Sequence, residues 1–105
     1  MQEKEIIDLI LSFPGTELYP HFDRIGFKIA KKSLFATYLA KDNSVNIFLT
    51  PEEQKVFCKM NNGVYPVPNK WGQKGATTFD LKKVPLEILR EGILSAYNNI
   101  LFSRK

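Results

Sequence analysis

The stretch RIGFKIAKKSLFATYLAKDNSVNIFL, residues 24–49, decides the fold. Over residues 24–30 apolar side chains alternate with polar or small ones, which is typical of a strand with one buried face. Residues 34–40 and 45–49 read as two further strands, and the stretches between them have turn composition. Such short links leave no room for crossover helices. The pattern therefore predicts an antiparallel meander.

Two helices are predicted on either side of this meander. Residues 3–13 carry apolar side chains at helical spacing, and the Pro-Gly pair that follows ends the helix. Residues 50–53, TPEE, combine a capping threonine, a proline at the first helical position and a glutamate that completes a capping box. This second helix should run to about Met60, with Val56 and Phe57 turned inward.

The remaining segments complete an α+β chain. Residues 16–23 are aromatic but aperiodic and are interpreted as a loop, whereas residues 76–81 are expected to form another strand. Pro85 opens a long helix, in which Gly92 indicates close approach of another part of the chain. The predicted order is α-β-β-β-α-β-α, with an antiparallel sheet packed against N- and C-terminal helices.

Composition places the chain among cytoplasmic single-domain proteins. It has 105 residues, of which 44% are hydrophobic and 25% charged, so we expect one domain over residues 1–105. No apolar run is long enough for a membrane span, and no secretory leader is expected. The single cysteine, Cys58, has no partner for an internal disulfide, which favours a reducing compartment.

The residues that usually carry catalysis or metal binding are sparse. His21 and Cys58 are the only members of their types, and neither has a carboxylate cluster beside it in the sequence. We therefore expect His21 to be a surface or hydrogen-bonding residue and Cys58 to pack as a small hydrophobe. No enzyme activity, metal or cofactor is predicted. A cysteine-dependent enzyme stays the third hypothesis, requiring an acidic, accessible thiol near the histidine.

Charge and aromatic residues indicate a binding surface. Residues 24–105 carry a net charge of +8, and residues 55–83 alone carry +5. Lysines that contact phosphates, together with aromatic rings that stack on bases, bind nucleic acid without a fixed sequence. The candidate nucleic-acid-binding residues are Lys28, Lys31, Lys32, Tyr65, Lys70, Trp71 and Lys74.

Several motifs resemble those of one known family, the MmcQ/YjbR-like proteins. The matching stretches are Pro20-His21-Phe22, Phe27-Lys28-Ile29, Leu34-Phe35-Ala36-Thr37, LTPEEQ at 49–54 and YPVPNKWG at 65–72. Gly75, Thr77, Leu81, Val84 and the Ala96-Tyr97 pair extend the match. The resemblance covers about residues 5–100, and the chain departs from the signature at Ala76, where a tryptophan is usual.

The resemblance implies both a fold and a function. The family is similar in fold to the bacterial frataxin homologues (CyaY-like), with a twisted antiparallel sheet against N- and C-terminal helices. Its members are assigned to DNA binding from a proposed double-wing arrangement of hairpins. Iron handling in the frataxin fold needs an acidic ridge on the first helix and adjoining strand. The basic residues Arg24 and Lys28 on the first predicted strand have the wrong charge for that role.

We expect a non-enzymatic binding module that contacts DNA weakly and with little sequence preference. The alternative is a protein- or small-ligand-binding domain that uses a pocket between residues 65–75 and the sheet. The environment of Trp71 distinguishes the two, because a buried indole favours the pocket and an exposed one beside Lys70 and Lys74 favours nucleic acid. The sequence leaves the oligomeric state open.

Overall fold

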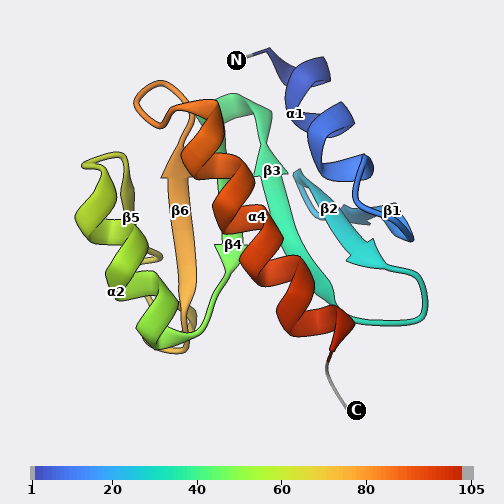
Figure 1. Ribbon diagram of the computed structural model, residues 1–105. Coiled ribbons are helices and arrows are strands. Elements are labelled where there is room, and N and C mark those ends of the chain that lie inside the picture. Colours follow the sequence, from blue (N-terminus) through green and yellow to red (C-terminus); the bar gives the residue numbers. More distant parts are fainter. Residues whose placement is uncertain (1, 103–105) are drawn as a thin grey trace.

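A six-stranded sheet forms the centre of the computed structural model, which describes residues 2–102 apart from the side chain of His21 (Figure 1). The strands are β1 (Thr16–His21), β2 (Arg24–Ile29), β3 (Leu34–Leu39), β4 (Ser44–Phe48), β5 (Val64–Pro66) and β6 (Ala76–Asp80). Their order across the sheet is β1-β2-β3-β4-β6-β5, and every neighbouring pair is antiparallel. The predicted meander is thus confirmed as β2, β3 and β4.

Helices cover one face of this sheet. They are α1 (Glu3–Leu11), α2 (Pro51–Met60) and α4 (Leu86–Leu101), which lie in front of the strands in Figure 1. Two short helices, η1 (Ala40–Asp42) and α3 (Lys70–Gln73), lie in the connections. We call the sheet face opposite α1, α2 and α4 the open face. The predicted α+β architecture with an antiparallel sheet is confirmed.

The core lies between the sheet and these helices. Phe27, Ile47 and Phe79 project from the strands and are fully buried. In α4, a Cβ on Gly92 would lie 2.7 Å from Cζ of Phe79 and 3.4 Å from Cδ1 of Ile47. The close approach predicted at Gly92 is therefore confirmed, and it lets α4 sit directly on the sheet.

The expectation of a loop over residues 16–23 is wrong, because residues 16–21 form the edge strand β1. It pairs with β2 along its whole length, from Thr16 opposite Ile29 to His21 opposite Arg24. As an edge strand it buries little, and Leu18 is 52% exposed. The alternation of buried and exposed residues that identifies an inner strand is consequently missing.

The second helix begins where the sequence predicts, with Thr50 and Glu53 forming the reciprocal capping box. The Glu53 N–H donates to Oγ1 of Thr50 at 3.1 Å, and the Thr50 N–H donates to the Glu53 carboxylate at 2.9 Å. Its predicted inner face is wrong in one position, because Val56 is 54% exposed. Phe57 is buried as predicted, and Gln54 is buried where Val56 was expected, which places a polar side chain beneath the helix.

Besides β1, the predicted order of elements lacks one further strand and the two short helices. Residues 64–75 contain both the short strand β5 and the helix α3. The strand expected at 76–81 and the long C-terminal helix are confirmed as β6 and α4. No helix in the described part of the chain has the length and apolar character to cross a membrane.

Candidate functional site

The segment that joins β5 to β6 is fastened to the start of α2. The Gln54 side-chain amide donates to the carbonyl oxygens of Gly72 and Ala76, at 2.9 and 3.0 Å. Gly75 has a φ of +116°, and a Cβ there would lie 1.8 Å from the carbonyl oxygen of Leu49. Only glycine permits this contact. The LTPEEQ and YPVPNKWG stretches thus form one structural unit.

Helix α3 presents aromatic and basic side chains together. Its N-terminal cap is Asn69, whose Oδ1 accepts from the Trp71 N–H at 2.8 Å. Trp71 is 65% exposed, and Nζ of Lys74 lies 5.2 Å from the centroid of its ring. Lys70 is exposed on the same turn. This helix carries an accessible indole with cations beside it, an arrangement that suits stacking on a planar anionic ligand.

The open face carries a row of residues that crosses the whole sheet. Strand pairing aligns, in order from β1 to β5, Tyr19, Gly26, Thr37, Asn46, Thr78 and Tyr65. Oγ1 of Thr78 donates to Oδ1 of Asn46 at 2.7 Å. The tyrosines at the two ends are each 46% exposed, so the row has a polar centre and an aromatic ring at each edge.

Arg24 extends over the centre of this row from β2. Its Nε donates to Oγ1 of Thr37 at 2.8 Å and its Nη2 to the Thr37 carbonyl at 3.3 Å. Burial lowers the pKa of Arg24, and the nearby Asp23 and Asp42 oppose that shift only in part. No carboxylate of the described residues forms an ion pair with it. A half-buried guanidinium therefore keeps N–H groups without an acidic partner.

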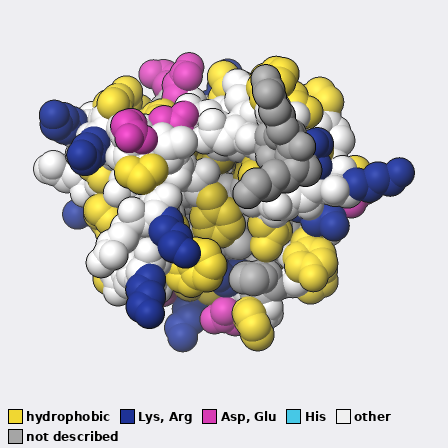
Figure 2. Space-filling view, turned by 90° about the horizontal axis from the view of Figure 1, so that it is seen from below, with side chains coloured by type: hydrophobic (Ala, Val, Ile, Leu, Met, Phe, Trp, Pro, Cys, Tyr) yellow, Lys and Arg dark blue, Asp and Glu magenta, His cyan; other side chains and the backbone are white. Residues whose placement is uncertain are grey.

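A pocket of about 710 Å³ lies where the row meets α3, a volume typical of small-molecule sites. The pairing of β3 with β4 ends at Ala36 and Ile47, and the pocket takes in the residues just beyond. Its lining includes the apolar side chains Leu34, Phe48, Leu49, Val67 and Ile100. Figure 2 shows a hollow near the middle of this view, with hydrophobic side chains inside it.

Polar and aromatic groups complete the lining. They are Phe22, Arg24, Thr37, Asn46, Asn69, Trp71 and Lys74, together with Ala76. Ala76 pairs with Phe48 across β4 and β6. The small side chain at 76 leaves space that Trp71 borders, whereas Phe79 points to the core and does not fill it.

The predicted binding residues fall into two groups. Trp71 and Lys74 line the pocket, with Lys70 on the same helix and Tyr65 on the neighbouring strand. On the other side, Nζ of Lys28 lies 5.3 Å from the centroid of the Tyr19 ring.

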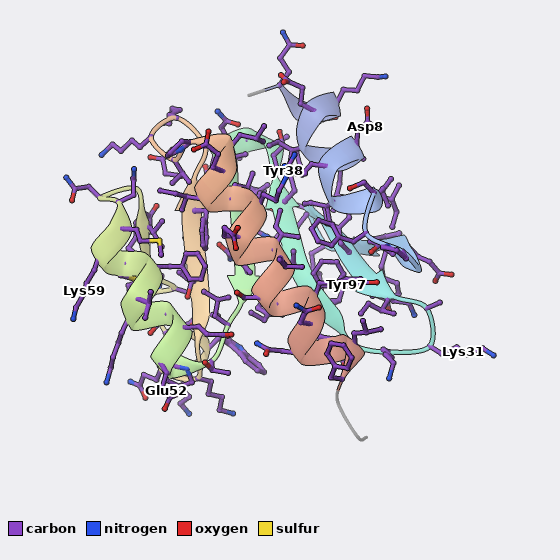
Figure 3. The ribbon with its side chains drawn as sticks, viewed as in Figure 1. Asp8, Lys31, Tyr38, Glu52, Lys59 and Tyr97 are labelled. Carbon is purple, nitrogen blue, oxygen red and sulfur yellow. The ribbon has the colours of Figure 1, made fainter. Side chains whose placement is uncertain are left out.

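Two lysines of the candidate set lie apart from the pocket. Lys31 and Lys32 belong to the β2–β3 connection, and Lys31 has a positive φ of 65°. Figure 3 shows Lys31 pointing away from the body of the molecule, on the side opposite α2. Lys28 is closer to the pocket, because it pairs with the pocket residue Leu34. The structure therefore places lysines on both sides of the pocket.

Sequence reasoning missed the polar centre of the site. Thr37, Asn46 and Thr78 lie in three different strands and converge only through sheet pairing. One signal was available, because Asn46 is the single polar residue of the otherwise apolar stretch VNIFL, residues 45–49. Arg24 was recognisable as a strand cation, but its position over Thr37 depends on the β2–β3 register.

The sulfur and metal chemistry of the chain can be placed only in part. Cys58 is half-buried in α2, and that burial raises the pKa of its thiol. The expectation for His21 concerns a side chain that is outside the described part of the structure. Among the described side chains, no group of three or more histidine, cysteine, aspartate or glutamate residues could hold a metal ion.

Comparison with known proteins identifies the fold and nothing further. No family model matches the chain, and no curated protein matches it. A crystal structure of a protein from Pseudomonas syringae, determined by the Northeast Structural Genomics Consortium, is similar with a TM-score of 0.72. The match covers 93% of this chain and 97% of that chain at 16% identity. The α+β arrangement described above thus occurs in a solved structure.

Proposed function

We propose that this chain is a non-enzymatic binding module that contacts DNA weakly and with little sequence preference. The proposal includes membership of the MmcQ/YjbR-like family with its CyaY-like fold, for which the motif resemblance is the support. In the structure, two of those motifs meet through the Gln54 side chain and together position α3. The resemblance and the geometry point to the same segment.

The observation that carries the proposal is the exposed Trp71 beside Lys74. An indole that served only to anchor its loop would be buried, whereas this one is 65% exposed and within 5.2 Å of an ammonium group. Lys70 adds a second cation on the same helix. The acidic helix α1 lies on the opposite, helix-covered face of the sheet and does not cover this surface (Figure 1).

The test is a fluorescence-anisotropy titration of labelled single- and double-stranded DNA at low and physiological salt. The wild-type chain should bind at low salt and lose affinity steeply as salt rises. The double variant Lys70→Ala/Lys74→Ala should bind every sequence more weakly, by roughly tenfold at low salt. The matched control is Lys82→Ala/Lys83→Ala, which removes the same charge at the other end of β6.

An equal loss of DNA affinity in the two double variants would show that only the net charge matters, and would contradict a site at α3. A loss confined to one DNA sequence would contradict the phosphate role of the lysines. Absence of binding to either form of DNA at low salt would refute the proposed function itself.

One observation favours a second candidate, a small-ligand-binding domain with no nucleic-acid role. The pocket of about 710 Å³ lies between residues of the 65–75 segment and the sheet, where that alternative requires it. Small-molecule sites combine apolar walls with a few convergent polar groups, as this pocket does. A screen of metabolites by thermal shift would support this candidate if a compound stabilised the chain while DNA did not bind.

A further inference from the structure

The polar groups at the floor of the pocket offer hydrogen-bond donors. The oxygen of the Asn46 side chain accepts from the Thr78 hydroxyl, and the Asn46 NH₂ group donates to no described residue, so it is available as a donor in the pocket that Asn46 lines. Arg24 donates one hydrogen bond from Nε and one from Nη2, both to Thr37. Its other N–H groups make no hydrogen bond to a described residue and are available to a ligand. The floor therefore suits a ligand rich in carbonyl or other acceptor atoms.

The walls suit a flat ligand. Trp71 stands at one side with its ring 65% exposed, and Phe48 lies beyond the end of the β3–β4 pairing with 37% exposure. Both line the pocket, and Ala76, which pairs with Phe48 and also lines it, adds almost no bulk. A planar ring can enter this space and contact aromatic surface while its edge reaches the donors below.

Lysines flank the pocket. Lys74 lines it from the α3 side, whereas Lys28 lies outside the lining, pairs with the pocket residue Leu34, and holds its Nζ 5.3 Å from the centroid of the Tyr19 ring. A strand that passes over the pocket would meet an ammonium group before and after it. A ligand with a planar, acceptor-rich group and a negative charge on either side of it matches a nucleotide within a single strand.

We propose that the pocket receives one unpaired base of single-stranded DNA, with the flanking phosphates on Lys28 and Lys74. This inference rests on the proposed function and narrows it to single strands. In a duplex the bases are stacked and paired, so a base must be extruded from the stack before it can enter a pocket. A free mononucleotide shares the base chemistry but lacks the second flanking phosphate.

The experiment measures anisotropy of labelled short oligothymidine, a duplex of equal length and an abasic strand of equal length, all at low salt. Free thymidine monophosphate serves as an unlabelled competitor. The wild-type chain should bind oligothymidine at least about tenfold more tightly than the abasic strand or the duplex, because base contacts act only in the first. Thymidine monophosphate should compete weakly.

Two variants locate the base. Ala76→Trp fills the pocket and should lower the affinity for oligothymidine to that for the abasic strand, while leaving duplex affinity unchanged. Asn46→Leu removes a floor donor with little change in volume and should act in the same direction. Leu94→Trp, on the exposed side of α4, is the matched control for an added indole. Circular dichroism verifies that each variant folds.

The outcomes separate the two proposals. Equal affinity for oligothymidine, abasic strand and duplex would overturn the base pocket and leave DNA binding through lysines intact. Undiminished oligothymidine binding by folded Ala76→Trp and Asn46→Leu would also overturn it. Thymidine monophosphate that binds while no oligonucleotide does would overturn it in favour of the small-ligand candidate. No binding of any DNA would refute the proposed function together with the inference.

Discussion

Gln54 and Gly72, 18 residues apart in the chain, are joined by a hydrogen bond of 2.9 Å from a buried side-chain amide to a backbone carbonyl. The same amide reaches Ala76 at the start of β6. One polar side chain beneath α2 thus links α3 to α2 and helps to fix the position of Trp71. A residue that never touches the pocket is in this way a positioning residue for it.

Replacing Gln54 with leucine should destabilise the fold and loosen α3. Leucine keeps much of the volume but removes two buried hydrogen bonds, which costs about 1–3 kcal/mol. Urea unfolding measures the loss, and Trp71 emission in the folded state reports the changed position of α3. Gln73→Leu is the matched control, because Gln73 lies exposed on α3 and should change stability by less than about 0.5 kcal/mol. Equal effects of the two substitutions would contradict the anchoring role.

Gly75 and Gly15 give a second, paired prediction. Both have positive φ, but a Cβ on Gly75 would lie 1.8 Å from the Leu49 carbonyl oxygen, whereas one on Gly15 would lie 3.7 Å from Ile29. Gly15→Ala should cost about 1–2 kcal/mol through backbone strain alone. Gly75→Ala should cost clearly more, because the backbone at Leu49, just after β4, must also move. Chemical denaturation measures the free energy of unfolding of both variants. Equal values for the two would contradict this prediction.

The sequence predicted best those elements whose signals are local. The capping box of Thr50 and Glu53, the alternation in β2 and the close approach at Gly92 each depend on residues near one another in the chain. The edge strand β1 was missed because exposure on both sides removes the alternation that marks a strand. Val56 was placed inward because its apolar character outweighed Gln54, whose partners lie 18 and 22 residues away.

The site was less predictable than the fold for a related reason. Trp71 and Lys74 could be proposed from their types, but the pocket needs β4 beside β6, with Asn46 and Thr78 separated by 32 residues. That pairing places β6 between β4 and β5, and β5 is a strand that was not predicted from the sequence. Strand order of this kind depends on packing of the whole sheet, and no local pattern records it.

Cys58 should behave as a protected thiol. Burial raises its pKa, so at pH 8 the native chain should hold less thiolate than a free cysteine and react slowly with iodoacetamide. The rate should rise with pH through and beyond the usual thiol pKa of about 8.5. Because the unfolded thiol ionises first, its contribution to stability is present below that pH and falls as the pH rises.

The measurement follows alkylation by mass spectrometry between neutral and alkaline pH, with the urea-unfolded chain as the control. Unfolding should accelerate the reaction at pH 8, since it exposes the sulfur and restores the ordinary pKa. Native alkylation at pH 8 that is as fast as in urea would contradict the protection and would revive the cysteine-dependent hypothesis.

The salt dependence of DNA binding counts the phosphate contacts that α3 makes. Each lysine that neutralises a phosphate contributes roughly 0.7–0.9 to the slope of log affinity against log salt. Removing Lys70 and Lys74 together should therefore lower the magnitude of that slope by about 1–2, whichever DNA sequence is used. Removing Lys82 and Lys83 should lower affinity slightly through net charge while leaving the slope within error of wild type. A steep slope retained by Lys70→Ala/Lys74→Ala would move the phosphate contacts away from α3, most directly to the β2–β3 connection that carries Lys31.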